Sequence, residues 1–223
     1  LFDQHPDGLE HYPSVFSAPS SDTTSPQRVD ARIYCLQAIA CDMDVASHWL
    51  MGSGATSGRT KFWVAGLMGV LPDLLVFIPN SFFLDERPEV NADTVTADFG
   101  WYAWEAYQVT HSLIWATIGF LFTWILFEKR GVTERLFTDN TLSARNAAIW
   151  LWLPWFIHIF NDIPTHTAKF FPTPFLAPFS DIQVDGYRWS TPWVWFTNLA
   201  IIIAIWSYVF YKRRYQSLIE EGA

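Results

Sequence analysis

The chain has 223 residues, of which 51% are hydrophobic and 18% are aromatic, and its formal net charge is −8. This composition is too apolar for an ordinary soluble domain, yet 16% charged residues is more than a bundle made only of membrane spans carries. The acidic charge is spread over loops and the C-terminal tail, so we see no basic face for nucleic acid and expect no nucleic-acid partner. Two cysteines, Cys35 and Cys41, are too few for a disulfide framework. We therefore predict a small all-α integral membrane protein, a helical bundle with about four transmembrane helices and polar loops.

Residues 1–42 differ in composition from the rest of the chain. They are rich in Ser, Pro and Asp, and such a segment cannot bury enough apolar surface to order itself. They also lack the basic segment and the long apolar core of a signal peptide. We predict that residues 1–42 are a disordered or non-native N-terminal extension, that Met43 is the biological start, and that residues 43–211 form the membrane-embedded domain.

His48 lies just after this segment, on a short predicted helix. Asp42 or Asp44 can cap that helix at its start, and we expect Gly52 and Gly54 to end it. A single histidine on a short helix is usually structural or exposed. A ligand role for His48 therefore depends on whether it meets other polar side chains.

The first predicted span covers residues 62–78 and contains Pro72 followed by Asp73. Its length is close to the lower limit of about 17 residues for crossing a membrane. A carboxylate at membrane depth next to a proline marks a functional candidate, because broken helices are tolerated there only where they line a cavity or pack on protein. The structural alternative is a neutral Asp73 that is hydrogen-bonded to a neighbouring helix.

A polar, mostly acidic connection over residues 79–107 precedes the second predicted span, residues 109–127. We expect a solvated loop there, with a short aromatic helix around residues 101–107. The second span opens with Thr110-His111-Ser112. If the two spans are antiparallel, His111 lies at the same end of the bundle as Asp73.

The third predicted span, residues 147–160, is short and runs into His158, Asp162 and His166, each four residues after the last. Positions four apart share one helical face, so His158 and Asp162 can point at one object. Pro164 is expected to end or bend the helix, which lets His166 approach from the following turn. Imidazole and carboxylate groups in this pattern suit a borderline metal such as zinc. The alternative is an interfacial cap, in which these polar side chains return to water where the helix leaves the lipid.

The last part of the chain combines a Pro- and Phe-rich connection, residues 167–191, with a fourth predicted span, residues 193–211. The connection is either a lid over the site or an aromatic collar at the membrane interface. Residues 212–223 form a predicted cytoplasmic tail that begins with Lys212-Arg-Arg. The sequence as a whole shows no internal repeat, no phosphate-binding loop, no dinucleotide fingerprint and no nucleophile elbow.

The positive-inside rule orients this arrangement. Basic residues precede the first span, follow the second and follow the fourth, so these segments are expected to face the cytoplasm: Arg59, Lys61, the loop 129–145 and residues 212–214. The remaining candidates then converge on the outer end of the bundle: Asp73, His111, His158, Asp162 and His166. His48 precedes the first span and is expected on the other side. It joins the group only if its helix re-enters the bundle or the first segment does not fully cross.

The short motifs around these residues are similar to those of a known bacterial family. Asp-Val-Ala-Ser-His48, Gly-Val-Leu-Pro-Asp73, Thr-His111-Ser and His158-x-x-x-Asp162, followed by Pro-rich sequence, resemble the membrane-bound metal-dependent hydrolases. These are also described as inner-membrane-associated hydrolases and are linked by name to a LexA-binding protein. The resemblance covers roughly residues 43–211. The family in turn looks distantly similar to zinc-dependent phospholipase C.

The resemblance implies a hydrolase in the bacterial inner (plasma) membrane that acts on an ester or phosphoester. We expect it to use a divalent metal, and zinc is the metal we favour. Because the site is expected to open at the outer face near the headgroups, we expect the substrate to be a lipid or a lipid-linked phosphate that the bilayer presents. On this hypothesis the metal ligands come from His48, Asp73, His111, His158, Asp162 and His166, and the catalytic carboxylate is Asp73 or Asp162. Family members often carry a His-Arg pair ahead of Thr-His-Ser, whereas this chain has Tyr107-Gln-Val. The alternative is a non-enzymatic membrane scaffold or small transport subunit with structural buried His and Asp residues.

Overall fold

The computed structural model describes residues 45–83 and 93–221, and within these ranges the chain is helical with no β-strand. The all-α prediction is confirmed for this part of the chain. The predictions for residues 1–42 and for Met43 lie outside the described residues. After a helix over residues 45–55, the elements are α2 (Phe62–Asn80), η1 (Thr96–Phe99), α3 (Gly100–Thr110), α4 (Leu113–Arg130), α5 (Ala144–Thr165) and α6 (Pro192–Glu221).

Two helices among the described residues, α2 and α6, are long and apolar enough to cross a membrane. A third crossing is present if η1–α3 and α4, which meet at a bend of 59°, count as one broken span. By length and composition the described residues therefore provide two to three candidate spans, not clearly the four that were predicted. The third span was predicted on α5, but α5 is not among these candidate spans. Its apolar stretch is interrupted by polar residues such as His158 and Asp162.

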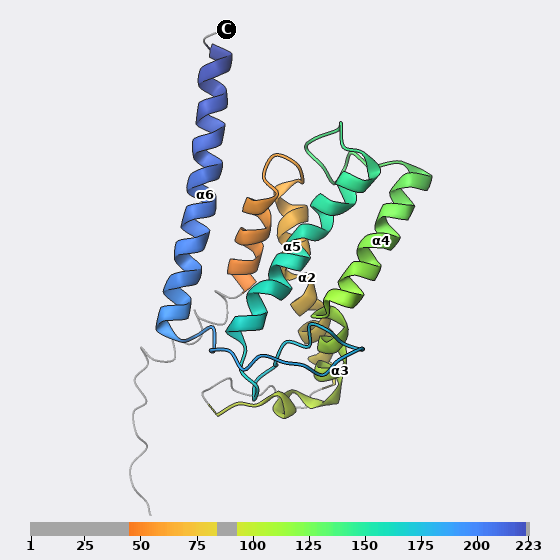
Figure 1. Ribbon diagram of the computed structural model, residues 1–223, viewed down its shortest axis with the longest axis vertical. Helices are drawn as coiled ribbons and strands as arrows, with labels where there is room; N and C mark the ends of the chain where they lie inside the picture. Colours follow the sequence, from red (N-terminus) through yellow and green to blue (C-terminus); the bar gives the residue numbers. More distant parts are fainter. Residues whose placement is uncertain (1–44, 84–92, 222–223) are drawn as a thin grey trace, which may run out of the picture.

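The helix α5 occupies the middle of the bundle, with α2 on one side and α4 on the other (Figure 1). A core of Ala116, Trp155 and Ile159 fills the contact between α4 and α5. Two of these side chains are almost completely buried, although the same helices carry many exposed apolar residues elsewhere. α5 is thus held by its neighbours on both sides, and this fixes the direction in which its polar end points.

The helix over residues 45–55 packs back along α2 in the antiparallel direction. The Ser53 hydroxyl donates to the carbonyl of Phe62 at 3.0 Å, while a Cβ on Gly69 would lie 2.6 Å from the carbonyl oxygen of His48. The prediction that Gly52 and Gly54 end this helix is wrong, since the helix continues to residue 55. Gly52 instead lies inside it, where a Cβ would approach that of Pro154 to 2.8 Å. The absence of a side chain permits this close packing.

The predicted second span begins later than the sequence indicated. α3 ends at Thr110 and α4 begins at Leu113, with His111 and Ser112 between them. The Ser112 hydroxyl accepts hydrogen bonds from the backbone N–H groups of Ile114 and Trp115, so it caps α4. The break leaves His111 at a helix junction rather than inside a continuous helix.

The helix α6 is much less buried than α2. Only 17% of its apolar window is buried, compared with 39% for α2. Two side-chain hydrogen bonds join α6 to the first helix and the turn after it. Trp206 Nε1 donates to the carbonyl of Leu50 at 3.2 Å, and the Arg213 guanidinium donates to the Ser57 hydroxyl. Figure 1 shows α6 standing beside the bundle and extending beyond it. The helix also continues past residue 212, where the tail was predicted to begin.

Candidate metal centre

Four acidic and imidazole side chains from separate elements meet at one end of the bundle. Asp73 comes from α2, His111 from the junction between α3 and α4, and His158 and Asp162 from successive turns of α5. One potential ligand atom from each lies within 4.8 Å of all the others. The side chains of His111, His158 and Asp162 are at most 1% exposed, and that of Asp73 is 15% exposed. This buried group could hold a metal ion.

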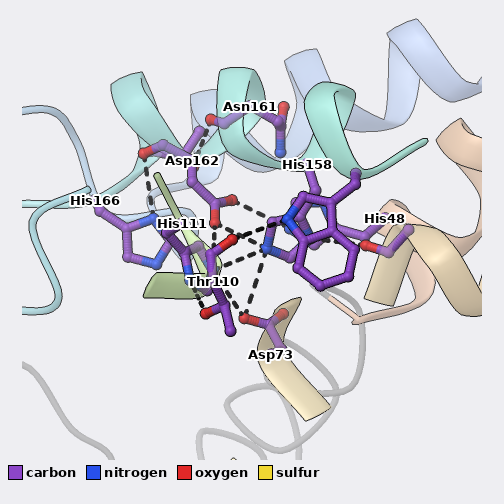
Figure 2. Close-up of polar contacts among 11 residues, drawn as sticks. His48, Asp73, Thr110, His111, His158, Asn161, Asp162 and His166 are labelled. Atoms are coloured by element: carbon purple, nitrogen blue, oxygen red, sulfur yellow. Dashed lines mark hydrogen bonds and ion pairs between the residues drawn. The ribbon is translucent and has the colours of Figure 1, made fainter. Parts of the chain in front are cut away.

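The Nε2 atoms of the two histidines are the centre of the group (Figure 2). They lie 3.0 Å apart. Asp162 Oδ2 is 3.1 Å from His158 Nε2 and 3.3 Å from His111 Nε2. Asp73 Oδ1 approaches the same two nitrogens from the other side, at 3.6 Å and 3.3 Å respectively. Both carboxylates therefore face both imidazoles.

The opposite ring nitrogens have partners of their own, which fix the orientation of the rings. His158 Nδ1 lies 2.7 Å from the carbonyl oxygen of Gly69, and because a carbonyl only accepts, Nδ1 carries the proton and donates it. In neutral His158 the lone pair is then on Nε2, toward the group. His111 Nδ1 lies 2.9 Å from the hydroxyl of Thr110. Partners of this kind set the tautomer and orientation of metal-binding histidines.

The group concentrates acceptors in a space from which water is largely excluded. Carboxylate oxygens and an unprotonated Nε2 repel one another at these distances, and buried charge is costly unless it is compensated. Positive charge at the centre resolves both problems, either as protons on the imidazoles or as a bound cation. Two imidazole nitrogens and two carboxylate oxygens are a donor set that divalent metals of borderline softness accept.

His48 reaches the same end of the bundle from the first helix. Its Nε2 lies 3.2 Å from Asp162 Oδ1, and its ring is 3.8 Å from the ring of His158, centroid to centroid. The sequence analysis expected His48 to join the group only if its helix re-entered the bundle or the first segment did not fully cross. The antiparallel packing of this helix on α2 brings His48 to the group. His48 thus contacts the second oxygen of Asp162, on the side away from His111.

His166 lies next to the group but is not one of its four members. It follows the last turn of α5, and its Nδ1 is 3.2 Å from the backbone carbonyl of Asp162. Pro164 lies within the last turn of α5 and the helix ends at Thr165, so His166 leaves the helix axis as expected. Its recorded hydrogen bond goes to the main chain of Asp162 rather than to the carboxylate.

Three further residues position the group, and none was named as a site residue from the sequence. Tyr107 stacks on the His111 ring with centroids 3.6 Å apart and planes at 18°. Gly69 and Thr110 supply the partners of the histidine Nδ1 atoms described above. Two of the three lie within the quoted motifs, and Tyr107 precedes His111 by one helical turn. Spacing alone gave no reason to separate them from ordinary core residues.

The Pro- and Phe-rich connection is attached to the start of α4, beside the group. Leu113 N donates to the carbonyl of Phe175 at 3.0 Å, and the Ser112 hydroxyl donates to that of Ala177 at 2.5 Å. Phe171 is buried against Tyr107, whereas Phe179 is 81% exposed. The first half of the connection therefore covers the bundle end, and its tip has the exposure expected of an interfacial collar.

The opposite end of the bundle carries a different charged cluster. Arg59 forms an ion pair with Asp139 and lies 5.8 Å from the ring of Trp150. Hydrogen bonds from the Thr141 hydroxyl and backbone N–H, helped by Arg59, hold the pKa of Asp139 below its ordinary value of 3.8. The Arg59 side chain is 47% exposed and that of Asp139 is 16% exposed, so water reaches this pair, mainly on the arginine side.

Comparison of the chain with protein-family models, with curated proteins and with solved structures finds no match. The family resemblance drawn from the short motifs therefore stays a prediction. The chemical interpretation of the site depends on its own geometry, on the four converging side chains and on the residues that orient them.

Proposed function

We propose that this protein is a membrane-embedded, metal-dependent hydrolase that acts on an ester or phosphoester, with zinc as the metal. The observation that carries the proposal is the buried group of Asp73, His111, His158 and Asp162. Three separate elements contribute to it, and hydrogen bonds to the rings orient the two imidazoles toward its centre. Zinc favours nitrogen and oxygen ligands in this combination.

Membrane embedding is supported by the apolar surface of the helices. Exposed large apolar side chains are numerous on α2, α4 and α6, including Leu75, Phe122 and Ile203. In the proposed topology α2, α4, α5 and α6 cross the bacterial inner membrane, and the basic segments face the cytoplasm. Being short in apolar length, α5 crosses within the protein, between α2 and α4. The metal group then opens near the outer surface, where a lipid or lipid-linked phosphate is presented by the bilayer.

The two carboxylates take different roles in this proposal. Asp162 contacts three histidines and is 1% exposed, so it serves to hold the metal and the imidazoles. Asp73 is 15% exposed and lies at the accessible edge of the group, where it accepts the proton of an attacking water. A bound divalent metal supplies polarisation of the substrate oxygen and lowers the pKa of a coordinated water toward about 7.

The proposal is tested by the metal content of protein purified in detergent without chelator. We expect close to one zinc per chain in the wild type and loss of it in His158→Ala, with His166→Gln as the matched control that keeps the metal. Hydrolysis of phospholipid and phosphodiester substrates is then compared with and without chelator. Substoichiometric metal that is the same in wild type and His158→Ala contradicts the metal centre.

The competing function is a scaffold in which the same residues serve as interhelical hydrogen-bond partners. Such contacts contribute about 0.6–2 kcal/mol each in membrane bundles and need no metal. A scaffold therefore tolerates Asp73→Asn with a modest loss of stability, and its melting temperature does not respond to chelator. If added metal raises the melting temperature and chelator removes that increase, the result supports the metal-dependent hydrolase over the scaffold.

A further inference from the structure

A pocket of about 560 Å³ lies between η1, the start of α3 and the connection that follows α5. Its volume is within the range of about 300–1,000 Å³ typical of small-molecule sites. In Figure 1 these elements lie at the end of the bundle opposite the α4–α5 loop. The residues that characterise its lining are Thr96, Gly100, Trp101, Trp104, Lys169 and Gln183.

The pocket joins apolar walls to a positive charge. Trp101 and Trp104 provide two indole rings, and Lys169 provides an ammonium group with three donors. Within the described residues Lys169 forms no ion pair. The ion pairs found there involve Arg59 and histidines at the metal group. The Lys169 backbone carbonyl accepts from Thr96 N at 3.1 Å, which ties the lysine's main chain to η1. The main chain of Lys169 is thus fixed at the wall, and its exposed side chain is free to meet an anion.

The pocket is connected to the metal group by one face of α3. Trp101, Trp104, Tyr107 and His111 follow each other at intervals of three or four residues, so they lie along the same side of the helix. Trp104 and Tyr107 are stacked at 6.2 Å, and Tyr107 is stacked on His111. At 1.5 Å per residue, Trp104 lies about 10 Å along the helix from His111. A ligand held against Trp104 is therefore a neighbour of the metal group and does not belong to it.

Exposed aromatic and aliphatic side chains surround the pocket. Trp101 is 72% exposed and its ring lies 6.2 Å from that of Phe83, and Ile182 next to Gln183 is also exposed. Exposed aromatic residues gather at membrane–water interfaces, where one part of a ligand is apolar and the other polar. A cation at the wall and apolar side chains at the rim match an amphiphile with an anionic head.

We propose that this pocket binds the headgroup of an anionic phospholipid, with the phosphate at Lys169 and the glycerol and first acyl carbons against Trp101 and Trp104. The proposal rests on the membrane placement in the proposed function, but not on the metal. It adds a lipid site beside the metal group, at which the bilayer supplies the ligand directly.

The test measures binding of dihexanoyl phosphatidylglycerol to the full chain in an uncharged detergent, by calorimetry. Parallel titrations use dihexanoyl phosphatidylcholine and inorganic phosphate. We expect phosphatidylglycerol to bind best and Lys169→Glu to weaken it about tenfold or more, as expected for loss of a charge-assisted contact. Lys169→Arg keeps most of the affinity, and Trp104→Ala weakens binding.

Two controls separate this inference from general effects and from the metal function. Lys129→Glu, an exposed residue at the other end of α4, makes the same change in net charge and leaves binding intact. Asp73→Asn alters the metal group and also leaves lipid binding intact, so the two proposals can fail separately. Equal binding of the zwitterionic lipid, equal binding of inorganic phosphate, or no effect of Lys169→Glu overturns the lipid site.

Discussion

The two ends of the bundle each place carboxylates against cationic or protonatable side chains, but in opposite environments. At one end, Asp162 meets His48, His111 and His158 with at most 1% of each side chain exposed. At the other end, Asp139 pairs with Arg59, which is nearly half exposed. The residue types are similar, and the surroundings differ.

The difference shows how burial changes the contribution of a charged contact to stability. A solvent-exposed pair has only a small effect on stability, because water already solvates both charges. A buried group must be compensated internally, and removing one member leaves the others uncompensated. Only the buried end therefore requires compensating positive charge within the protein, which protons on the imidazoles or a bound metal ion could provide.

Matched removal of one carboxylate at each end gives the largest expected contrast. Asp162→Ala leaves three imidazoles without their shared partner, and we expect a loss of about 3 kcal/mol or more in the free energy of unfolding. Asp139→Ala is expected to cause only a slight change, much smaller than that of Asp162→Ala. Thermal unfolding of the two variants in detergent measures both. Similar shifts in the two variants would mean that burial does not separate the two ends.

A smaller effect is expected from Gly69→Ala, which perturbs the support of the group rather than a ligand. The new Cβ would lie 2.6 Å from the His48 carbonyl oxygen, and overpacking of this kind costs about 1–3 kcal/mol. The Gly69 carbonyl also orients His158, so we expect metal affinity to fall by about tenfold. Metal titration followed by thermal unfolding measures the two effects.

The control for this substitution is Gly119→Ala, which is crowded but distant from the metal group. A Cβ on Gly119 would lie 2.2 Å from the ring of Trp152, in the contact between α4 and α5. We expect it to destabilise the bundle without a change in metal affinity. If both glycine variants weaken metal binding equally, the effect comes from general loosening and not from the orientation of His158.

The smallest expected effect is the pH dependence of the exposed pair. Because the pKa of Asp139 is lower in the folded state than its ordinary value, its contribution to stability is present at neutral pH. That contribution is lost as the pH falls through the folded-state pKa. The melting temperatures of wild type and Asp139→Asn should differ slightly at pH 7 and converge in acid, as they should in high salt. A difference that grows in acid contradicts this sign.

The sequence by itself determined the local part of the site. The spacing of His158 and Asp162 places them on one face of a helix whatever surrounds it, because the helical repeat is fixed by the backbone. Pro72 and Asp73 in an apolar segment, and His111 before another, identify polar groups that are expensive to bury. These local and compositional signals were enough to nominate all four members of the buried group.

Only the tertiary structure decided which candidates meet. His111 and His158 are 47 positions apart in the chain, and His158 and Gly69 are 89 apart, so no local repeat relates them. His48 reaches Asp162 because glycines let the first helix lie directly against α2, and α5 is buried by packing on both sides rather than by its own apolar length. Distances between helices depend on which backbones can approach closely, and a repeat along one chain segment carries no information about that.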